Sequence, residues 1–302
     1  MIDRFKRAPQ ARFAWRRVAR YAATLSLVAV AGCTVVRPWS KPWAKGRVST
    51  FSHEDYANVL HRFVDKRGQV DYASIKVYRD DLEIYYKGLS FYSPDSHPQL
   101  FPTDAHKLAY WINAYNAAAI KTVLKYYPVR SVADISGPVS VNFLMPRSGF
   151  FLAHRIMLGG DTFSLYSLEH QVIGARFNDP RVHFALNAAV RGGPRLARVP
   201  YSADHLEEQL EDATKRFFAD DRNLRVDHDT KTVYLSSILK WYKNDFVGWL
   251  ERTDPESEAS LLAYAELYAP VEKSSDLAMA EDYTIEFVDF DWRLNDSNAG
   301  AE

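Results

Sequence analysis

The 302-residue chain contains a single cysteine, Cys33, and this limits how the chain can be held together. One cysteine cannot form an intramolecular disulfide, so a folded domain has to be stabilised by packing. Hydrophobic residues make up 47% of the chain and aromatic residues 14%. That content is sufficient for a large core over roughly 270 residues. We therefore expect one globular domain over residues 51–302.

The segment before Cys33 is typical of a secretory signal peptide. Residues 1–20 carry seven basic side chains against one acid, and residues 21–32 carry no charge. Those twelve uncharged residues are too few for a membrane-spanning helix, which needs about 20. They end in Val30-Ala31-Gly32-Cys33, which resembles a lipobox. In a lipobox, the peptidase cleaves before the cysteine and the thiol carries a diacylglyceryl group.

We accordingly expect residues 1–32 to be a lipoprotein signal peptide and Cys33 to be the lipidation site, which would anchor the protein to a membrane. Thr34 follows Cys33 where an aspartate would favour the inner membrane, so the expected location is the periplasmic face of the outer membrane. Residues 33–50 mix Pro, Gly and basic side chains and suit a tether. The alternative is an ordinary signal-peptide core that contains a cysteine.

Charge and motif patterns exclude several classes of function. Lys plus Arg equals Asp plus Glu at 38 each, so no whole-chain field favours nucleic acid. The sequence contains no H-E-x-x-H, G-x-S-x-G, Walker, G-x-G-x-x-G or EF-hand pattern, and its nine histidines are scattered. We therefore expect neither a metal site nor a cofactor.

Hydrophobic spacing and turn residues predict a helix-rich α+β domain with a small, mostly antiparallel sheet. The clearest helix spans residues 104–127 and ends at Pro128. Its apolar residues step by three and four, which predicts one buried stripe. Further helices are expected at about 52–64, 73–86, 203–219, 236–250 and 255–268, and a short one is expected to run from Ser164 or Ser167 through Arg176. Strands are expected at 181–190, 231–235 and 283–294, and hairpins or irregular loops at 129–165.

The most distinctive pattern is a series of short segments in a fixed order. They are V-D-Y-A-S-I-K from Val70, Y-W-I-N-A-Y-N-A-A-A-I from Tyr110, S-L-Y-S-L-E-H from Ser164, F-N-D-P-R-V-H-F-A-L-N from Phe177, L-S-S-I-L-K-W-Y-K-N-D-F from Leu235 and V-D-F-D-W-R-L-N from Val288. Together they resemble the landmarks of the domain-of-unknown-function 547 family. The resemblance implies no established activity. It does imply cysteines after H-F-A-L, where this chain has Ala188 and Gly193, so thiol chemistry is expected to be lost here.

Residues of the expected strand at 181–190 form one candidate site. Alternation places His183 and Asn187 on the same face, about 13 to 14 Å apart, among small residues where a ligand could lie. The alternative for His183 is a histidine hydrogen-bonded within the structure.

Asn113 and Asn116 lie three residues apart on the long helix. Asparagine is a poor helix former, so two in mid-helix need an explanation. They could contribute amides to a ligand pocket. We favour a structural role, in which each buried amide binds the backbone of a neighbouring loop.

Glu169 and His170 lie in the expected helix after Ser164. If His170 faces a cleft, it could act as a general base, with Glu169 paired to a nearby cation. A solvated histidine beside a glutamate near the helix start is the alternative. Arg191 precedes Gly192-Gly193-Pro194, a turn whose amides could bind an anion together with the arginine.

Two functions remain open. The first is a non-catalytic envelope lipoprotein domain that binds a small ligand or an envelope protein, and the missing thiols favour it. The second is a thiol-independent hydrolase or transferase that uses Glu169, His170 and His183. Convergence of these three side chains with Asn116 in one cleft would favour catalysis, and dispersal would favour binding.

Overall fold

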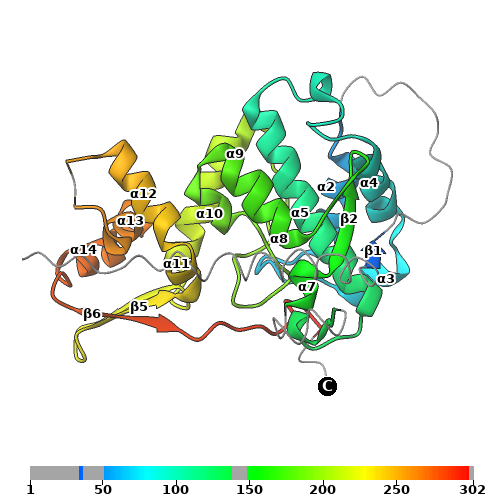
Figure 1. Cartoon of the computed structure of the whole chain (residues 1–302). Helices are drawn as coiled ribbons and strands as arrows, with labels where there is room; N and C mark the ends of the chain where they lie inside the picture. Colours follow the sequence, from blue (N-terminus) through cyan, green and yellow to red (C-terminus); the bar gives the residue numbers. More distant parts are fainter. Residues whose placement is uncertain (1–33, 37–50, 138–147, 257, 299–302) are drawn as a thin grey trace, which may run out of the picture.

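The computed structural model of the chain describes residues 34–36, 51–137, 148–256 and 258–298. The expected signal peptide, the expected lipidation site Cys33 and residues 37–50 of the expected tether lie outside these residues. Figure 1 shows an elongated molecule with β2 (His154–Leu158) towards one end and α14 (Val271–Ala278) at the other.

Most of the regular structure is helical. The helices of the first half are α2 (Glu54–Phe63), α3 (Tyr72–Val77), α4 (Asp80–Phe91), α5 (Asp104–Tyr126), α7 (Gly149–Leu152), α8 (Leu165–Ser167) and α9 (Ala175–Phe177). Those of the second half are α10 (Leu206–Ala219), α11 (Ser237–Trp241), α12 (Lys243–Thr253), α13 (Leu261–Tyr268) and α14. A π-helix covers Leu168–Gly174, and 3-10 helices cover Pro98–Leu100, Val132–Asp134, Pro180–Phe184 and Ala203–His205. None of the helices in the described ranges has both the length and the apolar composition needed to cross a membrane.

Helix α5 lies at the centre of the first hydrophobic core. The Thr103 side chain accepts a hydrogen bond from the His106 amide and caps the first turn, and the helix ends shortly before Pro128, which has no amide hydrogen to continue it. The predicted helix at 104–127 is therefore confirmed. The expected single buried stripe is wrong, because every residue from Leu108 to Val123 is buried. Helices α3 and α4, strand β2 and the π-helix pack around α5.

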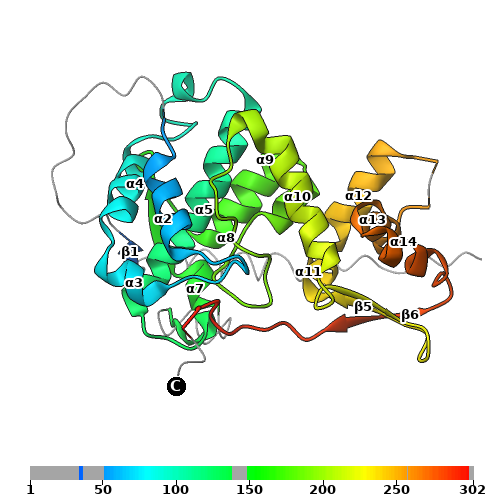
Figure 2. The same cartoon turned by 180° about the vertical axis from the view of Figure 1, so that it is seen from behind.

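A second hydrophobic core lies beside the first. It joins α10, α12 and α13 through side chains such as Phe218, Phe246 and Tyr264. Figures 1 and 2 show α12, α13 and α14 together at one end of the molecule in both views. The 3-10 helix at Pro180–Phe184 links the two cores, because Val182 belongs to the first and Phe184 to the second.

The strands form two small sheets. One has the order β1 (Thr34–Val36), β2, β3 (Asp161–Phe163), and the other β4 (Leu224–Asp227), β5 (Thr232–Ser236), β6 (Thr284–Val288). Each sheet combines a parallel pair, β1 with β2 or β5 with β6, and an antiparallel pair. Helices α11 to α14 lie between β5 and β6 in the chain and make the crossover that a parallel pair requires. The helix-rich α+β class is confirmed, with two sheets in place of one.

The predicted strand at 181–190 is wrong. The Asp179 carboxylate accepts a hydrogen bond from the Arg181 amide, and Pro180 occupies the first helical position, so the chain begins a 3-10 helix there. Irregular chain follows Phe184, and Ala189 has a positive φ of 61°. His183 and Asn187 therefore do not share the face of a strand.

Other elements also have boundaries that differ from the expected ones. The helix expected at 73–86 is two helices, α3 and α4, with Asp71 capping the first of them through the Ser74 amide. The strand expected at 283–294 ends at Val288, and residues 289–294 continue as irregular chain with isolated bridges. The loop region expected at 129–165 contains the β2–β3 hairpin, which confirms that interpretation for its described part.

Candidate functional site

A cavity of about 400 Å³ lies where the two cores meet. The first core contributes Leu186 and Val190 to its lining, and the second contributes Ile238. Most of the rest of the lining is aromatic, and these residues are Tyr115, Phe151, Tyr166, Trp241, Tyr242, Phe290 and Trp292. A pocket of this size with few polar groups has the usual character of a small-molecule site.

Glu169 and His170 reach this cavity from the π-helix at Leu168–Gly174. The segment starts from a capping box, in which Ser164 and Ser167 each accept a hydrogen bond from the other's backbone amide. π-Helical turns are rare and are frequently found at functional sites. The sequence predicted a helix start at Ser164 or Ser167, and the structure places it at Ser164, but the sequence gave no signal for the π-helical geometry.

Two tyrosine hydroxyls hold the Glu169 carboxylate. The Tyr242 hydroxyl donates to Oε1 at 2.5 Å, and the Tyr115 hydroxyl donates to Oε2 at 3.2 Å. Burial, and next the charge of Glu169, raise the pKa of both tyrosines well above the ordinary range. Both hydroxyls therefore remain neutral donors to Glu169. His170 lies beside them, with its ring 4.2 Å from the Tyr166 ring and 5.9 Å from the Tyr242 ring.

His183 lines the same cavity and pairs with an acid from α12. Its Nε2 lies 2.8 Å from Oδ2 of Asp245, and its ring stacks on Tyr242 at 3.8 Å between centroids. The hydrogen bond from His183 lowers the pKa of Asp245 below its ordinary value. The other ring nitrogen, Nδ1, is buried and has no hydrogen-bond partner among the described residues. Asp245 and Tyr242 were not predicted, because only folding brings them to His183.

Asn116 and Asn187 serve the backbone of the chain that forms the cavity wall. The Asn116 side chain donates to the Ala185 carbonyl at 3.0 Å and accepts from the Asn187 amide at 2.8 Å. The Asn187 side chain in turn accepts from the Ala189 amide at 2.9 Å and donates to the Pro194 carbonyl at 2.6 Å. Both side chains are almost fully buried and do not line the cavity. Their side chains satisfy backbone groups that would have bonded to a neighbouring strand if this segment were the expected strand.

Asn113 binds a different loop in the same way. Its amide donates to the Tyr201 carbonyl at 2.7 Å and accepts from the Tyr201 amide at 2.9 Å. The structural interpretation of Asn113 and Asn116 therefore agrees with the geometry, since each one holds irregular backbone against α5.

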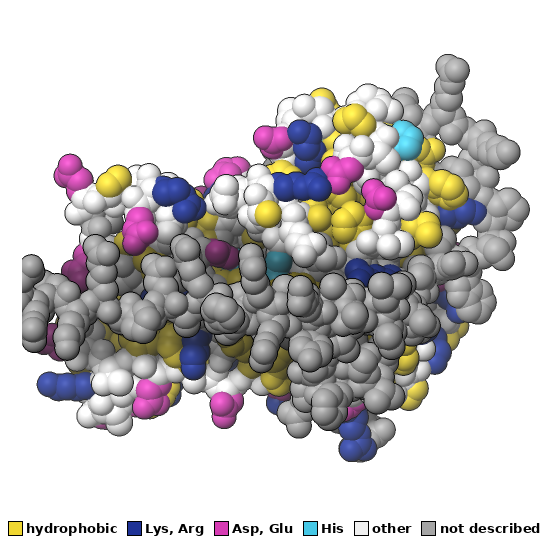
Figure 3. All heavy atoms as spheres, in the orientation of Figure 1, with side chains coloured by type: hydrophobic (Ala, Val, Ile, Leu, Met, Phe, Trp, Pro, Cys, Tyr) yellow, Lys and Arg dark blue, Asp and Glu magenta, His cyan; other side chains and the backbone are white. Residues whose placement is uncertain are grey.

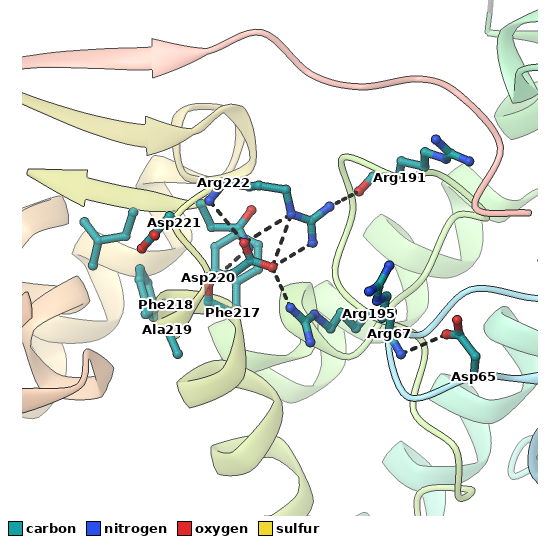
Figure 4. A network of polar contacts seen from close by, with 12 residues as sticks. Asp65, Arg67, Arg191, Arg195, Phe217, Phe218, Ala219, Asp220, Asp221 and Arg222 are labelled. Carbon is teal, nitrogen blue, oxygen red and sulfur yellow. Dashed lines mark hydrogen bonds and ion pairs between the residues drawn. The ribbon is translucent and has the colours of Figure 1, made fainter. Parts of the chain in front are cut away.

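Arg191 holds the C-terminal segment and is not part of the cavity lining. Its Nε donates to the Leu294 carbonyl at 3.2 Å, and its own carbonyl accepts from Arg222 at 3.2 Å (Figure 4). The next amide, that of Gly192, donates to the Asp291 carbonyl at 2.9 Å. The groups considered for an anion site therefore bind backbone carbonyls. Arg222 also joins Arg195 around the Asp220 carboxylate, which fastens the start of β4 to this turn.

Glu169, His170 and His183 thus line one cavity, while Asn116 does not. Ala188 and Gly193, the positions where the family resemblance implies cysteines, line it as well. The hydrogen bonds of Glu169 and His183 go to tyrosines and to Asp245, and none joins two of the three expected catalytic residues in the described chain.

In the part of the chain that the structure describes, neither the charge distribution nor the possible metal ligands indicate a further site. Within the described residues, no group of three or more His, Cys, Asp or Glu side chains could hold a metal ion. Positive and negative side chains are interspersed on the face shown in Figure 3.

Comparison with known proteins gives one match. Neither the curated proteins nor the solved structures contain a match to this chain. Residues 100–218 match the model of a family described as "Protein of unknown function, DUF547". This segment includes Glu169, His170 and His183, and the match confirms the family resemblance seen in the sequence over residues 100–218.

Proposed function

We propose that the described domain is a non-catalytic binding domain that holds a small organic ligand in the cavity between the two cores. The composition of the cavity wall supports this proposal. The wall is largely aromatic and has few polar groups. Among the described residues that line it, there is no cysteine, serine or threonine, so these residues offer neither a thiol nor an aliphatic hydroxyl as nucleophile.

A variant that fills the cavity tests this proposal. Ala188 lines the cavity and is only half-buried, so Ala188→Trp places an indole in the ligand space. Ala278→Trp is the matched control, because Ala278 is exposed at the end of α14. Both purified variants and the wild type are screened against a fragment library by ligand-observed NMR. We expect Ala188→Trp, and not Ala278→Trp, to lose the fragments that bind the wild type. A screen in which Ala188→Trp binds the same fragments as the wild type would contradict the proposal.

We also propose that a lipid on Cys33 displays this domain on the periplasmic face of the outer membrane. The charge bias, short apolar segment and Val-Ala-Gly-Cys sequence before position 34 support this proposal. Mass spectrometry of the protein from its own cells is expected to give a mature chain that begins at an acylated Cys33. An unacylated Cys33 with residues 1–32 still attached would contradict it.

A thiol-independent hydrolase or transferase is the second candidate, and the pairing of His183 with Asp245 is the observation that favours it. A histidine oriented by a carboxylate is the usual arrangement of a general base. On this hypothesis, His170→Ala and His183→Ala fail to rescue a deletion phenotype although both variants fold with wild-type stability. Full rescue by both variants would exclude a catalytic role for these histidines.

A further inference from the structure

Glu169 brings an unbalanced negative charge to the cavity. It is the only Asp, Glu, Lys or Arg side chain among the described residues of the lining. Within the described chain it takes part in no ion pair, and its two hydrogen bonds come from neutral tyrosines. Asp245, the nearby acid, already pairs with His183. Glu169 is half-buried, so a ligand that covers it removes its charge from water, which is costly unless a charge partner or sufficient hydrogen bonds compensate it.

The Glu169 carboxylate also has capacity for a further partner. A carboxylate offers about four acceptor positions, and the hydroxyls of Tyr115 and Tyr242 use about half of them. These two bonds fix the position of the carboxylate in the wall. A ligand that donates to Glu169 or carries a positive charge would therefore meet a group that is already oriented, which lowers the entropic cost of binding.

Two tryptophans and a phenylalanine form one aromatic cluster in the cavity lining. Trp292 lies 4.6 Å from Phe290 and 5.9 Å from Trp241 between ring centroids. Trp241 is 50% exposed and Trp292 is 38% exposed, so both rings are accessible to a ligand. The face of an aromatic ring attracts cations, and tryptophan is the strongest of the aromatic side chains in this respect.

We propose that the cavity binds an organic ammonium cation, held against the indole rings of Trp241 and Trp292 and balanced in charge by Glu169. The inference rests on the proposed function, because it assigns the ligand class of the same cavity. An anionic ligand would be repelled by Glu169, and a neutral apolar ligand would leave its charge unbalanced. A cation satisfies the carboxylate and the aromatic wall together.

The test compares two molecules of the same shape that differ in charge. Choline carries a quaternary ammonium group, and 3,3-dimethylbutan-1-ol has a neutral carbon in its place. Isothermal titration calorimetry at about pH 8, where histidine is ordinarily neutral, measures both against the full mature protein. Glu169→Gln removes the charge while keeping the shape of the side chain. Glu266→Gln is the matched control, since Glu266 is exposed on α13.

We expect choline to bind at least about tenfold more tightly than the alcohol, and Glu169→Gln to remove most of that difference. Glu266→Gln should behave as the wild type. Trp292→Leu gives a second reading that leaves the carboxylate in place, and it should also weaken choline more than the alcohol. Circular dichroism confirms that each variant is folded.

Three results would overturn the cation inference: equal affinities for the two probes, wild-type choline binding by Glu169→Gln, or no saturable heat with choline. Each of these leaves the proposed function standing as long as fragments bind the wild type and not Ala188→Trp. If the fragment screen fails as well, the proposed function is wrong along with the ligand class.

Discussion

The buried amide of Asn116 is expected to be one of the most sensitive positions in the protein. Asn116→Leu keeps a branched side chain with the same number of heavy atoms but removes the partners of two backbone groups, the Ala185 carbonyl and the Asn187 amide. Asn116 is 2% exposed, and Ala185 and Asn187 are 4% exposed each, so water does not readily replace the lost bonds. A buried polar group without a partner costs about 1–3 kcal/mol, and the two together cost about 2–6 kcal/mol. That is a large part of the roughly 5–15 kcal/mol that stabilises a typical domain.

Urea denaturation followed by tryptophan fluorescence and far-UV circular dichroism measures this loss. The midpoint should fall while the denaturant dependence stays unchanged, because the surface exposed on unfolding is the same. Asn58→Leu is the matched control, because Asn58 is an exposed residue of α2 and should change stability by no more than about 0.5 kcal/mol. If Asn116→Leu also changes the free energy of unfolding by less than about 0.5 kcal/mol, the backbone of residues 185–187 does not depend on this side chain and the argument fails.

Three further predictions concern the rest of the chain. Gly192→Ala should lower stability by about 1–3 kcal/mol in a thermal melt, because the added Cβ would lie 2.6 Å from the backbone nitrogen of Asp291; an unchanged melting temperature would contradict this. Lys231→Gly should raise the free energy of unfolding in urea by about 1 kcal/mol, because Lys231 has a positive φ of 50° in an exposed turn that glycine adopts without strain; a lower value would refute it. Burial lowers the pKa of His53 from 6.5 to about 4, so the folded state resists its protonation. His53 therefore contributes stability above pH 6.5 that is lost as pH falls from 6.5 towards 4. This loss amounts to about 3 kcal/mol, and denaturation at a series of pH values should show that His53→Gln removes it. Equal pH dependence of the two proteins would contradict it.

Local patterns predicted the elements whose causes are local. Helix α5 has apolar residues throughout its length, a capping Thr103 before it and Pro128 after it. Residues next to each end therefore determine where the helix begins and ends. The next helix was expected to begin at Ser164 or Ser167, and these two serines form the capping box at its start. These elements were predicted because the sequence near them specifies them.

The segment 181–190 was predicted wrongly because its conformation depends on a distant residue. Its apolar residues alternate as they would in a half-buried strand, and a pattern of period two cannot by itself distinguish a strand from irregular buried chain. Asn116 supplies the hydrogen bonds that allow the chain to leave the extended conformation. It lies 69 residues in sequence from Ala185 and 71 from Asn187, its two partners. Asp179 and Pro180 gave a local signal for the 3-10 helix, since an aspartate before a proline is a common helix start.

The candidate site shows the same division. Sequence reasoning selected Glu169, His170 and His183, and all three line the cavity. It did not find Tyr242, which donates to Glu169 across 73 residues, or Asp245, which pairs with His183 across 62 residues. Partners at such separations are set by the docking of the two cores, and no spacing within one segment encodes them.

The position of the cavity gives ligand binding a further consequence for stability. One part of the lining comes from the first core and the π-helix, and another part, with Ile238 and Tyr242, comes from the second core. The Glu169 to Tyr242 hydrogen bond already spans this boundary. A ligand that touches both parts binds only when the cores are docked, so it stabilises the docked arrangement by an amount that grows with the logarithm of its concentration above Kd. A rise of the melting temperature with choline concentration, absent in Glu169→Gln, would therefore report on the junction of the two cores as well as on the ligand.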